Sequence, residues 1–134
     1  IRLPEGQGNI HVLAFGSRDH KAKLKVNGEV HEIFVARFHG PIGDADRRIL
    51  DKDFNFLRLR PAFLKNQMVA AFSPYTHGIK GNLPYYPNYL FHYILPLGVT
   101  LELPKDPELF IAAISLSRTP IAFPLNGQAA GWPL

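Results

Sequence analysis

Histidine is the residue type in this sequence that could most directly hold a metal ion or act as a general base, and the chain has six. Their spacing supports neither role. His20 and His31 share one face of a predicted β-hairpin but lie about 13 Å apart at the usual strand rise, too far for two ligands of one zinc ion. The sequence also lacks cysteine and any His-x3-His or His-Glu-x2-His pattern. We therefore expect no metal or cofactor, and isolated or hydrogen-bonded histidines.

An acidic run starting at Asp51 imitates the opening of a calcium-binding loop, with a second acidic residue at Asp53. The imitation fails at two positions that such a loop requires. Position 6 should be glycine but is Phe56, and position 12 should be a bidentate glutamate but is Ala62. We expect these carboxylates to cap helices or to lie in solvated turns.

Nucleophilic catalysis has no clear support in the sequence. None of the serines lies in a Gly-x-Ser-x-Gly elbow, and no Gly-x-Gly-x2-Gly or Walker loop is present. Ser17, Asp19 and His20 are close in sequence, but a catalytic triad is assembled in space, so adjacency carries no weight. A non-catalytic protein is the favoured interpretation, and a histidine-dependent hydrolase remains an alternative.

The tyrosines give the strongest indication of a binding surface, because all of them fall between residues 75 and 93 whereas the phenylalanines are spread along the chain. Tyrosine combines a large contact area with a hydroxyl that needs water or a partner, and it is favoured at recognition surfaces. Prolines stiffen the same stretch. We predict a preorganised contact segment over residues 74–93; the alternative is a loop packed on the core with its hydroxyls outward. The candidate contact residues are Tyr75, His77, Tyr85, Tyr86, Tyr89, His92 and Tyr93.

Charge suggests a second candidate surface. The formal net charge is +4, and most charged residues lie in the first half of the chain. Lys21, Lys23 and Lys25 alternate along one predicted strand, so they should share an exposed face. Together with stacking tyrosines, such a face would suit single-stranded nucleic acid or another anionic ligand. We expect nucleic-acid binding to be weak, because a modest positive excess permits such partners without requiring them.

A β-hairpin over residues 21–36 is the clearest predicted element, because two alternating runs flank Asn27-Gly28. A type I′ turn at this pair would place Leu24 opposite His31 and turn Leu24 and Val26 toward the core. Further strands are expected over residues 9–16, 54–60 and 97–103. Short helices are expected from Asp44 to residue 50 and over residues 61–72, although residues 68–72 could form a strand; residues 107–117 suit either a helix or a strand.

These elements predict a mainly β protein, either a single-domain β-sandwich or a partly open barrel with one or two short helices. The domain should cover residues 1–118. An extended arm rich in proline and glycine should follow over residues 119–134, with Trp132 as a contact residue. The stretch without Asp, Glu, Lys or Arg from residue 81 to 101 is interrupted by prolines, so no membrane span is expected.

The favoured function is a non-catalytic binding or assembly protein, such as a structural subunit of a homo-oligomer or of a complex with other chains. The tyrosine segment and the carboxy-terminal arm would supply the contacts, since depletion of charge with enrichment of aromatic residues is typical of interface cores. The alternatives are a module for single-stranded nucleic acid or another anionic ligand, a carbohydrate-binding module that uses the tyrosines, and the hydrolase named above.

Overall fold

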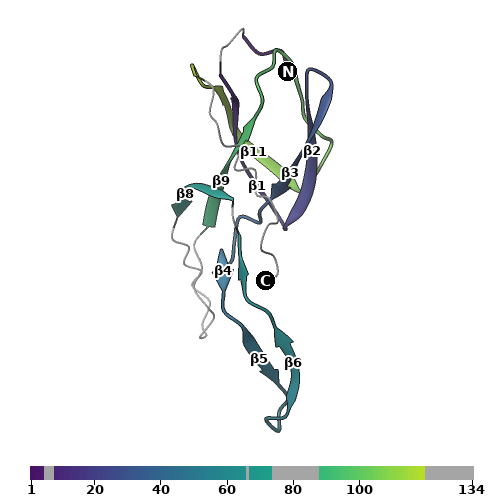
Figure 1. Ribbon diagram of the computed structural model, residues 1–134, viewed down its shortest axis with the longest axis vertical. Coiled ribbons are helices and arrows are strands. Elements are labelled where there is room, and N and C mark those ends of the chain that lie inside the picture. Colours follow the sequence, from purple (N-terminus) through teal and green to yellow (C-terminus); the bar gives the residue numbers. More distant parts are fainter. Residues whose placement is uncertain (5–7, 66, 74–87, 120–134) are drawn as a thin grey trace.

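The computed structural model describes residues 1–4, 8–65, 67–73 and 88–119 (Figure 1). These residues form β-strands and no helix, so this part of the chain contains no helix that could cross a membrane. The strands are β1 (Ile10–Gly16), β2 (His20–Val26), β3 (Glu29–Val35), β4 (Gly43–Asp44), β5 (Arg47–Leu50), β6 (Phe56–Arg60), β7 (Phe63–Leu64), β8 (Met68–Ser73), β9 (Asn88–Leu95), β10 (Leu101–Glu102) and β11 (Leu109–Leu116).

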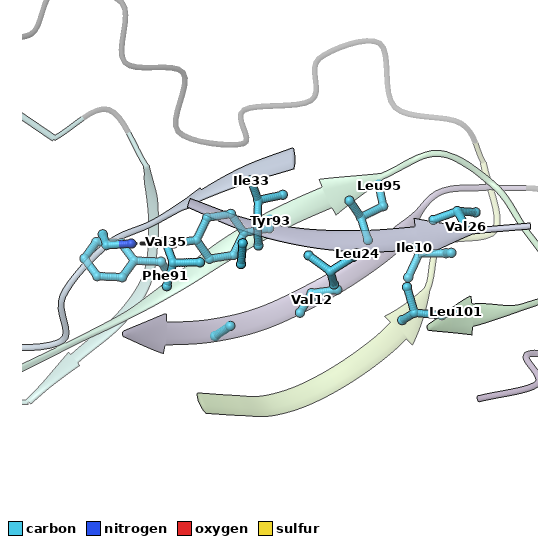
Figure 2. Close-up of a cluster of buried hydrophobic side chains, with 13 residues drawn as sticks. Ile10, Val12, Leu24, Val26, Ile33, Val35, Phe91, Tyr93, Leu95 and Leu101 are labelled. Carbon is cyan, nitrogen blue, oxygen red and sulfur yellow. Dashed lines mark hydrogen bonds between the residues drawn. The ribbon is translucent and has the colours of Figure 1, made fainter. Parts of the chain in front are cut away.

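Two antiparallel sheets face each other and form a β-sandwich. One sheet has the order β11-β1-β9-β8, and the other has the order β10-β2-β3. Side chains at alternate positions of β1, β2, β3 and β9 fill the space between the sheets, as Figure 2 shows. Each fully buried aliphatic or aromatic side chain contributes about 1.5–3 kcal/mol to folding. The mainly β prediction is therefore confirmed.

The predicted hairpin is confirmed in its register. Leu24 pairs with His31, and Asn27 and Gly28 have φ angles of 51° and 84°, as a type I′ turn requires. Asn27 Oδ1 also accepts hydrogen bonds from the backbone N–H groups of residues 99 and 100, at 3.0 and 3.2 Å. The turn therefore also fixes the segment that leads into β10.

The helices predicted from the sequence are wrong, because the residues thought to begin them bond across strands. Asp44 pairs with Phe63 in the β4–β7 ladder, and the Asp46 carboxylate accepts a hydrogen bond from the backbone N–H of Ala62. Residues 68–73 form β8 against β9, and residues 109–116 form β11 against β1, so the strand alternative is confirmed in both segments. Capping and proline signals are local, and long-range strand pairing overrides them here.

Residues 43–64 leave the sandwich as a two-stranded extension, which we call the ribbon. β4 pairs with β7 at its base, and β5 pairs with β6 further out. Figure 1 shows the ribbon extending away from the two sheets along the long axis of the molecule. Residues 54–60 were expected to form a strand, and β6 confirms residues 56–60, whereas Phe54 lies before the strand.

Candidate functional site

The outer half of the ribbon exposes apolar side chains on one face. Leu50 lies opposite Phe56, and Leu59 lies opposite Arg48. A β-bulge between these two pairs interrupts the alternation of β6, so Leu50, Phe56 and Leu59 lie on the same face, which Arg48 shares. All residues of β6 are exposed, including Leu57, whose exposed fraction is 61%. A cluster of exposed apolar side chains is a candidate interaction surface.

The opposite face of the ribbon is basic. Arg47 lies opposite Arg60, and Arg58 lies opposite Ile49, which places three arginines on this face. The Arg47 guanidinium is paired with the Asp44 carboxylate at 2.9 Å. One face of the ribbon is therefore mainly apolar, with Arg48 among its members, and the other is mainly cationic, with Ile49 among its members.

The tip of the ribbon is held by the Asp51 side chain. Its carboxylate accepts hydrogen bonds from the backbone N–H groups of Asp53 at 2.8 Å and Asn55 at 2.9 Å. The bond from Asn55, with smaller contributions from its side chain and from Asp53, lowers the pKa of Asp51. This network holds Phe54 in a left-handed conformation with φ of 64° and 83% exposed. The run that imitates a calcium loop therefore forms a turn, as expected.

A cavity of about 370 Å³, which we call the basic cavity, lies where the ribbon joins the sandwich. Asp19 Oδ1 accepts hydrogen bonds there from the backbone N–H of Arg37 at 2.7 Å and from Lys65 Nζ at 2.9 Å. The Arg60 guanidinium lies 5.6 Å from the centre of the Phe63 ring, which is a cation–π geometry. His39 and Pro41 complete the lining.

An apolar groove of about 340 Å³, which we call the aromatic groove, lies where β8 and β9 meet the segment after β3. The Phe15 ring packs 5.7 Å from the Phe38 ring, and Phe72 on β8 is 68% exposed. A hydrogen bond of 2.7 Å from the Tyr89 backbone N–H to the Phe38 carbonyl joins the two walls. The groove therefore presents aromatic rings with few polar groups.

The three lysines predicted to share a face lie exposed on β2, and Leu24 and Val26 on the opposite face are buried, so this prediction is confirmed. Their charge is largely compensated. Lys21 pairs with Glu32 at 2.7 Å, and Lys25 pairs with Glu102 at 3.0 Å. The hydrogen bond from Lys21, together with the charges of Lys21 and Lys23, lowers the pKa of Glu32. The face is thus a mixed surface rather than a strongly cationic one.

The contact segment predicted around the tyrosines is divided by the structure. Tyr89 and His92 are half-buried on β9, and the C-terminal arm with Trp132 lies outside the described residues, as do Tyr75, His77, Tyr85 and Tyr86. Tyr93 is buried in the core, and its hydroxyl accepts a 3.0 Å hydrogen bond from the backbone N–H of Ala36. Its assignment as a surface contact is corrected, because strand alternation turns it inward with Phe91. Burial also raises its pKa.

One pair of histidines and one single histidine show which contacts the imidazoles make in the described part of the chain. His11 Nδ1 and His92 Nε2 are 2.7 Å apart, and their rings stack with centroids 4.9 Å apart. Burial, and then the neighbouring His11, lower the pKa of His92. His20 bonds the Arg18 carbonyl through Nδ1 and Asp106 through Nε2, both at 2.9 Å.

Neither arrangement brings together the serine, aspartate and histidine that the sequence places close to one another. Both ring nitrogens of His20 are engaged, and its carboxylate partner is Asp106 rather than Asp19, so the described residues do not assemble a triad from Ser17, Asp19 and His20. Among the described residues, no group of three or more His, Asp or Glu side chains is placed to hold a metal ion.

Sequence reasoning missed the ribbon surfaces and the basic cavity. The alternation in Phe56-Leu57-Arg58-Leu59-Arg60 was a usable signal for the ribbon, because arginines at every second position are unusual for a strand buried on both faces. The basic cavity left no signal, since Asp19, Arg37 and Lys65 come from separate parts of the chain.

The described part of the chain is an antiparallel β-sandwich domain that carries a two-stranded ribbon. A family model described as the AziU2-like beta-sandwich domain matches residues 1–120. The chain belongs to this family, which agrees with the fold described above. No significant match to this chain was found among curated proteins or among solved structures.

Proposed function

We propose that this chain is a non-catalytic binding and assembly protein, and that its ribbon docks by its apolar face onto another copy of the same chain. The observation that carries the proposal is the exposure of the ribbon. An isolated two-stranded hairpin is marginally stable in water, and apolar side chains on it contribute little until a second surface covers them.

The aromatic groove is the receiving surface in this proposal. It offers exposed rings, including Phe72 and Phe38, on the same molecule that exposes Phe54 and Leu57 on the ribbon. Aromatic side chains that enter a preformed apolar pocket are typical anchors of protein interfaces. Because one chain carries both surfaces, assembly needs no other component.

A contact between two different surfaces joins copies head to tail. Such heterologous contacts close into rings when the rotation between copies permits it, and otherwise they continue as filaments. The proposal therefore predicts assemblies larger than a dimer at high concentration. The tyrosine segment and the C-terminal arm retain their proposed role as additional contacts.

Light scattering over a range of protein concentrations tests the proposal. The mass of the intact protein should rise above the 15.1 kDa of one chain as concentration increases. Leu57→Ser and Phe54→Ser should lower the mass toward that of one chain, because each removes an exposed apolar group from the ribbon.

A matched control is Val30→Ser, which removes an apolar side chain of similar exposure from the sandwich at 53%. The control should assemble as the unmodified protein does. An unmodified protein that keeps the mass of one chain at every concentration would refute the proposal, and so would equal effects of Leu57→Ser and Val30→Ser.

A further inference from the structure

The basic cavity holds more positive than negative charge. Three basic side chains (Arg37, Arg60 and Lys65) line it, against the single carboxylate of Asp19, so its lining carries a formal net charge of +2. Cationic groups in a concave site focus the electric field and raise the local concentration of anions. A ligand with two negative charges would neutralise this excess.

Lys65 is an unusual member of the set, because its side chain is only 8% exposed. A buried ammonium group requires a partner, and Asp19 provides one at 2.9 Å. The same Asp19 oxygen also accepts the Arg37 backbone N–H at 2.7 Å. Among the described residues, Asp19 is therefore ion-paired with Lys65 and with neither of the two arginines.

Both arginines are held in place by contacts that leave donors available. Arg37 Nε donates a 2.6 Å hydrogen bond to the His39 carbonyl, and Gly40, with φ of 112°, allows the Arg37 guanidinium to lie close to the backbone. Arg60 rests over the Phe63 ring. A guanidinium has five N–H donors and binds phosphate through two parallel hydrogen bonds.

We propose that the basic cavity binds a small organic molecule through a phosphate monoester, with the phosphate between Arg37 and Arg60. A phosphate monoester carries a charge of about −1.5 to −2 at neutral pH, which matches the excess positive charge of the lining. The cavity of about 370 Å³ is within the range of small-ligand sites, and Phe63 and Pro41 offer an apolar wall for the organic part. This proposal does not rest on assembly through the ribbon, although Arg60 and Phe63 belong to the ribbon.

Calorimetric titration of the full chain with phenyl phosphate, at constant ionic strength in chloride, tests the proposal. Saturable binding with one equivalent per chain is expected, tighter than binding of inorganic phosphate. Arg60→Gln should weaken binding about tenfold or more, because it removes the two hydrogen bonds that the charged guanidinium would donate to the phosphate. Asp19→Asn should strengthen it, since the carboxamide oxygen can still accept hydrogen bonds from Lys65 Nζ and from the Arg37 backbone N–H, whereas the negative charge is removed.

Arg18→Gln is the matched control, because Arg18 is next to Asp19 in the sequence but is 70% exposed and does not line the cavity. Its affinity should equal that of the unmodified protein. Absence of saturable binding, or an equal loss in Arg18→Gln and Arg60→Gln, would overturn the proposal. If an oligonucleotide without terminal phosphates binds more tightly than phenyl phosphate, the ligand is not a phosphate monoester. If inorganic phosphate binds as tightly as phenyl phosphate, the cavity does not recognise the organic group.

Discussion

The sandwich and the ribbon are built from similar strands but use their apolar residues in opposite ways. In β1 and β2, every second residue is buried between the sheets, whereas all residues of β6 are exposed. Strand sequence alone does not decide burial, because burial depends on what the strand packs against. The sandwich stabilises this molecule by itself, and we propose that the ribbon gains its stabilisation from a second molecule.

The largest expected effect is on the free energy of unfolding, compared between one substitution in the sandwich and one in the ribbon. Leu24→Ala removes a fully buried side chain from the core and should lower the free energy of unfolding by about 2–5 kcal/mol. Leu57→Ala removes the same group from the exposed ribbon and should change it by about 0.5 kcal/mol or less. Urea denaturation measures both. Similar losses in the two variants would show that the ribbon is packed within its own chain.

A smaller effect tests the buried tyrosine of the sandwich. Tyr93→Phe leaves the Ala36 backbone N–H without its acceptor, so we expect a loss of about 1–3 kcal/mol in the free energy of unfolding. The half-buried Tyr89, substituted by phenylalanine, is the comparison variant and should lose less. If denaturant titration shows no change in the free energy of unfolding of Tyr93→Phe, the hydrogen bond to the Tyr93 hydroxyl does not stabilise the core.

The pH dependence of stability should also arise in the sandwich. Because burial lowers the pKa of His92, the unfolded chain takes up a proton at this position more readily than the folded chain. The stability that this pKa difference contributes is present above the pKa of His92 in the unfolded chain, about 6.5, and is lost as pH falls toward its lower pKa in the folded chain. Melting temperature should therefore drop from about pH 8 to about pH 5.

His92→Gln should flatten this pH profile, because it removes the titrating group and its contact with His11. His31→Gln, at a half-buried position of β3, serves as the control and should retain the slope of the unmodified protein. An unchanged slope in His92→Gln would assign the pH dependence to other groups.

The smallest effect is expected on the lysine face. The pair between Lys25 and Glu102 is 3.0 Å long, but both side chains are about half exposed, so solvent screens it. Lys25→Ala should lower the free energy of unfolding by less than about 1 kcal/mol. Thermal denaturation at low and high salt would check this, and a loss comparable to that of Tyr93→Phe would contradict it.

The sequence predicted elements whose signal is local and missed those that depend on distant partners. The hairpin at Asn27-Gly28 was predictable in register, because turn chemistry and alternation agree there. The helix predicted from Asp44 was not formed, since its side chain and backbone bond within the ribbon instead. Tyr93 was assigned to a surface because composition alone does not tell which face of β9 a tyrosine occupies.

The candidate sites were less accessible to prediction than the fold. The lysine face was located correctly, but its pairing with Glu102 joins strands 77 residues apart in sequence. The basic cavity likewise depends on the approach of the ribbon base to the loop that contains Asp19. Contacts between residues that are far apart in the chain leave no periodic pattern in the sequence, so the sequence alone does not predict them.

The central claim, that the ribbon of one copy docks in the aromatic groove of another, is tested most directly by mixing two defective variants. One variant carries Phe54→Ser and Leu57→Ser in the ribbon, and the other carries Phe72→Ser in the groove. Each alone should keep the 15.1 kDa mass of one chain in light scattering, because one of its two surfaces is impaired. Their mixture retains one intact ribbon and one intact groove, so it should form a species of about twice that mass. A mixture that stays at the mass of one chain, while the unmodified protein assembles, would contradict the account.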